Sequence, residues 1–137
     1  MSEVRTEITL VNIGDQNDAN RGYIPQSQVR RLTVNAMVNT GAWTLVINEA
    51  IREKLGLKVK KTGETVVAGG GTVPSQVTES VDVLWKDRET SCRALVLPGE
   101  GDVLLGAIPL EGMDLMVHPR KQEVVGAHGE TPLSVVK

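Results

Sequence analysis

Apolar and polar residues alternate along much of this chain, and the alternation predicts β-strands. The clearest case is the segment 32–38, LTVNAMV, in which Leu32, Val34, Ala36 and Val38 are apolar and point the same way. A period of two residues is typical of a strand that buries one face. Other strand-forming runs lie at residues 6–13, 43–47, 92–97, 103–105, 115–117 and 123–125.

Only one segment has a clear helical signature, NEAIREKLG at residues 48–56. Asn48 is a good N-cap, Ile51 and Leu55 are four residues apart, and Gly56 suits the residue after a helix. Residues 107–112 predict a single helical turn. The polar stretch GDQNDANRG at 14–22 is rich in turn formers and predicts a loop. We therefore expect a mostly all-β domain with one short helix.

Residues 64–85 predict a β-hairpin. ETVVA and VPSQVTESVDVLW form its two arms, and GGGT lies between them. Val77, Val81, Val83 and Trp85 are expected to share one face of the return strand, which Glu79 interrupts. Three consecutive glycines have broad backbone freedom, so the tip should move easily.

Composition and charge narrow the class of protein. A chain of 137 residues with 40% hydrophobic and 23% charged residues suits one globular domain. Trp43, Trp85 and Tyr23 are the only aromatic residues, so the core must be aliphatic. The net charge of −2 gives no basic field for nucleic acid or acidic membranes. We expect no nucleic-acid or membrane partner.

The remaining chemistry-bearing residues suggest no metal or cofactor. Cys92 is the only cysteine, which suits a reducing compartment and predicts a buried structural thiol. His118 and His128 lie far from any cluster with metal-ligand spacing, and we expect them at the surface. No signal peptide and no apolar run of about 18 residues are present, so we expect a cytoplasmic protein.

The order of these features resembles that of the retropepsin-like (clan AA) aspartic peptidases, in particular their short single-domain cellular members. The closest similarity lies in LTVNAMVNTGAWTLVINEAIREKLGL at 32–57, and VLLGAIPLEGMDLMV at 103–117 supplies a second signature. The resemblance covers residues 6–125. We therefore expect one domain over 1–137, with its core at about 6–125 and a C-terminal tail at 126–137.

This resemblance implies a closed β-barrel that acts as a homodimer on an extended peptide or protein substrate. Each copy supplies one aspartate to a pair that shares a proton around a water, and position 39 matches that aspartate. Thr40 would brace the two loops across the dimer, and Gly41 would allow the tight turn. The hairpin at 66–78 resembles the flap that closes over the peptide. The implied substrate-binding residues are Ala42, Ala68, Gly69, Gly70 and Gly71, and those supporting the active loop are Leu104, Leu105 and Gly106.

The sequence departs from the family at position 39, which is Asn39. An amide neither accepts nor releases a proton at ordinary pH, so both copies of a homodimer would lose base and acid together. We expect a folded but inactive peptidase. Asn39 is either natural, in a pseudoprotease that still binds peptides or dimerises, or a deliberate inactivating substitution. The intact motif around it favours the substitution.

Two further features have competing interpretations. Residues 69–71 resemble a phosphate-binding loop, but no GxGxxG, no Lys-Ser/Thr and no helix accompany them. Trp43 follows the active loop directly. Three roles fit it: shaping a substrate subsite, contributing to the dimer interface, or packing in the core.

Overall fold

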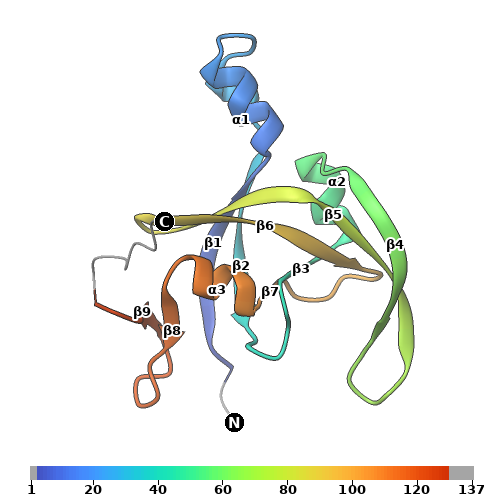
Figure 1. Ribbon diagram of the computed structural model, residues 1–137, viewed down its shortest axis with the longest axis vertical. Coiled ribbons are helices and arrows are strands. Elements are labelled where there is room, and N and C mark those ends of the chain that lie inside the picture. The colour runs from blue at the N-terminus through green and yellow to red at the C-terminus, as the bar shows by residue number, and fades with distance from the viewer. Residues whose placement is uncertain (1–2, 130–137) are drawn as a thin grey trace, which may run out of the picture.

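The computed structural model describes residues 3–129, and strands are their predominant secondary structure (Figure 1). The strands are β1 (Arg5–Val11), β2 (Arg31–Val38), β3 (Leu45–Asn48), β4 (Val59–Val66), β5 (Thr72–Trp85), β6 (Arg88–Leu97), β7 (Leu104–Leu105), β8 (Leu115–Val117) and β9 (Val124–Gly126). The helices are α1 (Ile13–Asn20), η1 (Gln26–Gln28, a 3₁₀ turn), α2 (Glu49–Leu55) and α3 (Ala107–Gly112). Within the described residues, no helix is long and apolar enough to cross a bilayer.

Six strands close into a barrel in the order β1-β2-β7-β3-β6-β5, because β5 also pairs with β1. The closing contact is antiparallel and aligns Thr9 with Leu84 and Val11 with Asp82. β4 lies outside the ring and pairs only with the first part of β5 among the described strands. The expected closed, mostly β barrel is confirmed. The single-domain boundary stays a prediction, and residues 130–137 of the expected tail lie outside the described residues.

Aliphatic side chains fill the barrel, as the scarcity of aromatic residues required. Ile8, Leu10, Leu45, Ile47, Val81, Val83 and Leu105 are almost completely buried. Trp85 is also buried, and its indole Nε1–H donates a 2.7 Å hydrogen bond to Oγ1 of Thr6. Cys92 is buried in the same core, which confirms the prediction for this thiol.

The loop predicted at 14–22 is wrong, because α1 occupies most of it. Asn12 starts this helix: its Oδ1 accepts a 2.9 Å hydrogen bond from the backbone N–H of Asp15. No residue of α1 is buried, so the helix has no apolar stripe that a sequence pattern could reveal. The strand before it consequently ends at Val11 and not at 13.

The helices α2 and α3 agree with prediction, whereas the 3₁₀ turn η1 was not expected. α2 is capped by Asn48 and ends at Gly56, whose φ of 65° is left-handed, and α3 is the short turn expected at 107–112. The return strand β5 differs in one respect. A bulge between Val77 and Ser80 changes the alternation, so Thr78 is fully buried and Val77 only half-buried.

Candidate active site

The loop between β2 and β3 begins at Asn39 and is closed by its own hydrogen bonds. The backbone N–H of Asn39 donates to the carbonyl oxygen of Leu105 at 3.0 Å. Its side-chain Oδ1 accepts from the N–H of Gly41 at 2.9 Å, and its carbonyl oxygen accepts from the N–H of Ala42 at 3.0 Å. The Asn39 side chain is therefore held at the surface end of the loop in a tight turn.

Residues 104–106 lie directly beneath this loop. β7 inserts between β2 and β3, where Leu104 is in register with Met37 and with Val46. A Cβ on Gly106 would lie 2.5 Å from the carbonyl oxygen of Ala42, so only glycine fits there. The structure thus brings together the two segments that the sequence singled out, although they are more than 60 residues apart.

A cavity of about 430 Å³ opens beside Asn39. It is lined by Glu3, Val4, Met37, Val38, Asn39, Thr40 and Val117. Glu3 is the only ionisable residue in that lining, and its carboxylate is paired with Arg5 at 3.0 Å. Within one described chain, the lining of this cavity therefore offers no free acid or base next to residue 39. Thr40 is exposed, and its expected contact with a second copy stays a prediction.

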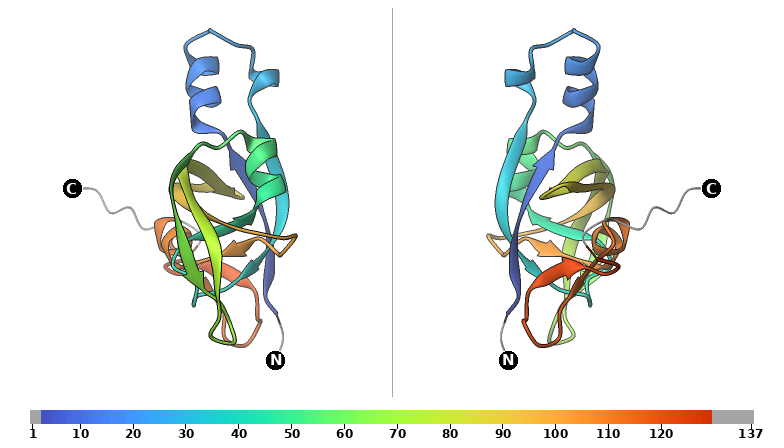
Figure 2. Two further views of the ribbon diagram at one scale, coloured as in Figure 1. Left: turned by 90° about the vertical axis from the view of Figure 1, so that its right-hand side faces the viewer. Right: turned by 90° about the vertical axis from the view of Figure 1, so that its left-hand side faces the viewer.

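The residues of the predicted flap lie on the hairpin of β4 and β5, and their role as a flap stays a prediction. The tip of this hairpin is closed by the hydrogen bonds Val67 N–H to Gly71 O (2.9 Å) and Gly70 N–H to Val67 O (3.0 Å). Gly69 and Gly70 have φ of 94° and 89°, a region that favours glycine. Ala68 is exposed, and a Cβ added at Gly69, Gly70 or Gly71 would meet no atom within 4 Å. The tip projects from the same end of the barrel as the β2–β3 loop, and α1 projects from the opposite end (Figures 1 and 2).

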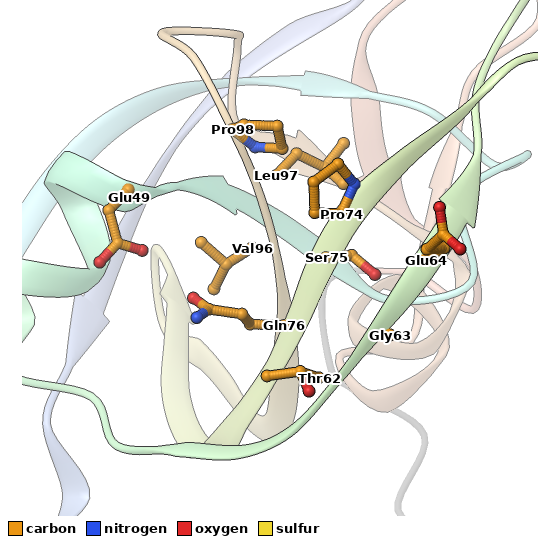
Figure 3. Close-up of a pocket in the computed structure, with 10 residues that line it drawn as sticks. All are labelled: Glu49, Thr62, Gly63, Glu64, Pro74, Ser75, Gln76, Val96, Leu97 and Pro98. Atoms are coloured by element: carbon orange, nitrogen blue, oxygen red, sulfur yellow. The ribbon is translucent and has the colours of Figure 1, made fainter.

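A second cavity, also about 430 Å³, lies at the base of this hairpin and had no signal in the sequence (Figure 3). The last paired residues of β5 and β6 there are Gln76 and Val96, and the two strands then separate. Pro74 and Pro98 line the separation, and neither has an N–H to continue the pairing. The lining includes no residue of the 39–44 loop, so this cavity is distinct from the candidate site.

Three other residues singled out by the sequence differ in their exposure. Trp43 is 51% exposed, so the core interpretation for it is wrong. His128 is exposed, as expected, and its Nδ1 lies 2.6 Å from Oδ1 of Asp114. His118 is half-buried, and its Nδ1 accepts two backbone N–H groups of the following turn. Among residues 3–129, no group of three His, Cys, Asp or Glu side chains is arranged to hold a metal ion.

Comparison with known proteins agrees with this geometry. The family described as "gag-polyprotein putative aspartyl protease" matches residues 25–118, a segment that contains the 39–44 loop, the hairpin and residues 104–106. A solved structure, the EIAV protease complexed with the inhibitor HBY-793, is similar over 77% of this chain and 82% of that chain. Its TM-score is 0.51 and its sequence identity 23%, so the likeness concerns the fold. No curated protein matches the chain.

Fold and loop together define the class as the retropepsin-like aspartic peptidases, which confirms the resemblance read from the sequence. The chain belongs to the gag-polyprotein aspartyl protease family. The matched segment begins after β1 and α1, so both elements lie outside the matched residues.

Proposed function

We propose that this chain is one subunit of a homodimeric aspartic endopeptidase, that residue 39 occupies the position of the catalytic aspartate, and that the Asn39 form is inactive. The observation that carries the proposal is the placement of Asn39, at the start of a tight loop supported by Leu105 and Gly106. The lone cysteine, Cys92, favours a reducing compartment such as the cytoplasm.

The reaction needs two carboxylates, and each chain has one such loop. Two carboxyl groups held close together share one proton, because both cannot ionise at once. The ionised group takes a proton from a water as the water oxygen attacks the peptide carbonyl carbon. The protonated group supplies its proton to the substrate, and the C–N bond then breaks as the leaving nitrogen is protonated. A two-fold axis beside residue 39 brings the second carboxyl group from another copy.

Asn39 fits the geometry of this site without its chemistry. Its amide has nearly the shape of a protonated aspartic acid, and its Oδ1 accepts the Gly41 N–H as an aspartate oxygen would. An aspartate at this position would therefore keep the loop. The amide itself offers no proton to transfer, and it cannot serve as a base.

The substrate is proposed to be an extended peptide that lies between the loop and the flap. Extended chains are held mainly by backbone hydrogen bonds, and side-chain pockets set the preference. Ala42 beside the loop is small enough to let a peptide backbone approach. The exposed tip at 68–71, with no atom near a Cβ on its glycines, leaves room for that backbone.

Restoring the carboxylate tests the proposal. The Asn39→Asp protein should cleave itself or members of a diverse peptide library at mildly acidic pH, and a pepstatin-type inhibitor should block the cleavage. Asn35→Asp is the matched control, because Asn35 is an exposed asparagine on β2 four residues away, and it should stay inactive. A folded, dimeric Asn39→Asp protein that cleaves nothing would end the peptidase proposal.

A second candidate function is suggested by Asn39 itself, since the surrounding loop is complete. In that case the chain binds extended peptides, or dimerises, without cutting. Peptide binding to the Asn39 form, together with an inactive Asn39→Asp form, would favour it. Weak cleavage by the Asn39 form that grows with sample age would favour the peptidase, because deamidation of Asn39 yields an aspartate.

A further inference from the structure

Two large apolar side chains next to the candidate site remain exposed in the single chain. Trp43 is 51% exposed and Ile108 is 45% exposed, whereas the other tryptophan, Trp85, is 7% exposed. An exposed tryptophan beside this loop is well placed to bind a partner, because burying its large apolar surface is strongly favourable.

Both residues belong to rigid backbone. The N–H of Ile108 donates to the carbonyl oxygen of Trp43 at 3.0 Å, and the preceding N–H of Ala107 donates to Ala42 at 2.8 Å. Thr44, the next residue after Trp43, is buried and donates from Oγ1 to the carbonyl oxygen of Arg93 at 2.7 Å. The two backbones are thus fixed before any partner arrives, which lowers the entropy cost of binding.

Trp43 lies close enough to residue 39 to take part in a contact that pairs two copies of that residue. Four Cα steps separate Trp43 from Asn39, so their Cα atoms are at most about 14 Å apart. A standard interface removes about 800 Å² from each partner, which corresponds to a disc with a radius of about 16 Å. With a two-fold axis beside residue 39, the exposed Trp43 is therefore close enough to reach the interface or the peptide groove that crosses it.

The position of α3 indicates whether a second copy of the chain or a bound peptide buries Trp43 and Ile108. In Figure 1, α3, which carries Ile108, lies on one side of the β2–β3 loop, and the flap hairpin lies on the other. A peptide held under the flap would not cover α3. We infer that Trp43 and Ile108 form an apolar anchor of the contact between two copies of this chain, an inference that rests on the homodimer proposed above. Buried tryptophans are frequent among the residues that dominate such contacts.

Acrylamide quenching of tryptophan fluorescence directly measures whether Trp43 becomes buried when the dimer forms. The experiment uses the full Asn39 chain over a dilution series, with its oligomeric state measured by sedimentation. In the Trp43→Phe protein, tryptophan fluorescence comes only from buried Trp85. The difference in quenching between the parent and this variant therefore gives the accessibility of Trp43. We expect Trp43 to become less accessible to acrylamide as the dimer forms, with no peptide present.

Substitutions supply a second, independent readout. Trp43→Ala and Ile108→Ser should each raise the dimer dissociation constant at least tenfold. Both side chains are about half exposed in the single chain, so the far-UV spectrum and the urea midpoint measured under monomeric conditions should change little. Tyr23→Ala is the matched control: Tyr23 is 73% exposed, and the loop that carries it adjoins α1 at the opposite end of the barrel, so dimerisation should be unaffected.

The outcomes separate this inference from the proposed function. A dimer in which Trp43 stays as accessible as in the monomer, with unchanged dissociation constants for the variants, overturns the anchor and leaves the homodimer intact. Protection of Trp43 only after peptide is added also overturns it, and assigns the residue to the groove. A chain that stays monomeric at every concentration overturns both proposals.

Discussion

Gly106 lies against the backbone of the loop that it supports: a Cβ on this residue would lie 2.5 Å from the carbonyl oxygen of Ala42 and closer still to that of Thr44. Both neighbours are backbone atoms of a loop fixed by hydrogen bonds to Leu105, Ala107 and Ile108. Neither can move aside without breaking those bonds. The loop carrying Asn39 and the segment beneath it are therefore a single unit.

Gly106→Ala should lower the free energy of unfolding by about 3 kcal/mol or more, because overpacking against backbone forces the loop to shift. Urea denaturation followed by circular dichroism measures the change. Gly101→Ala is the control, since its Cβ would meet no atom within 4 Å and its φ is not left-handed, and it should stay within about 0.5 kcal/mol of the parent. Equal midpoints for the two variants would contradict the close packing at Gly106.

Asn12 joins α1 to α2 through one buried side chain. Its Oδ1 caps α1, and its Nδ2–H donates a 2.7 Å hydrogen bond to the carbonyl oxygen of Leu55, near the end of α2. Asn12→Ala removes a cap and leaves a buried carbonyl without that donor, so it should cost roughly 2–4 kcal/mol. Asn17→Ala, on the exposed part of α1, should cost nothing. The measurement is again chemical denaturation, and a neutral Asn12→Ala would show that the two helices are independent.

Cys92 should make stability depend on alkaline pH. Burial raises the pKa of its thiol, and a hydrogen bond with Thr44 only partly opposes that shift. Above the ordinary thiol pKa of about 8.5, the unfolded chain loses this proton while the folded chain keeps it. The folded state then binds more protons, so stability falls as pH rises through that range.

Comparison with Cys92→Ala isolates this effect, because the two proteins share every other ionisable group. Between pH 7 and pH 10 the urea midpoint of the parent should fall further than that of the variant. Parallel pH profiles would mean that the thiol ionises equally in both states. Thiol reagents should also modify Cys92 far more slowly in the folded chain than in urea.

The Asn39→Asp protein should form a dimer whose affinity depends on pH, whereas the Asn39 form should not show that dependence. Two facing carboxyl groups keep a proton that the separated chains would release, so the dimer binds more protons than two monomers. Its dissociation constant should therefore rise as pH increases above the ordinary aspartate range. Sedimentation at pH 4.5 and 7.5 for both proteins tests this, and a pH-independent Asn39→Asp dimer would place the two residues too far apart to interact.

Local patterns were sufficient where a few neighbouring residues decide the structure. The alternation in 32–38 predicted β2, and the caps Asn48 and Gly56 predicted both ends of α2. The glycine run predicted the hairpin tip, and the order of motifs predicted the family and the closed barrel. For the strand, the helix ends and the hairpin tip, the signal comes from side-chain period or backbone freedom, both of which can be read from adjacent residues. The family and the closed barrel followed from the resemblance of the ordered motifs to known peptidases.

The tertiary structure decided what depends on distant residues. α1 has no buried face, so no hydrophobic period along its sequence predicts it, although Asn12 caps its N-terminus. The pairing of β1 with β5 and the contact of Gly106 with Ala42 join segments that are far apart in the chain. The exposure of Trp43, and with it the inferred contact between copies, follows from where the β2–β3 loop meets α3. The sequence by itself determined which residue stands at position 39 and what that residue cannot do, because proton chemistry belongs to a single side chain. Only the fold could place it, because position depends on every contact around it.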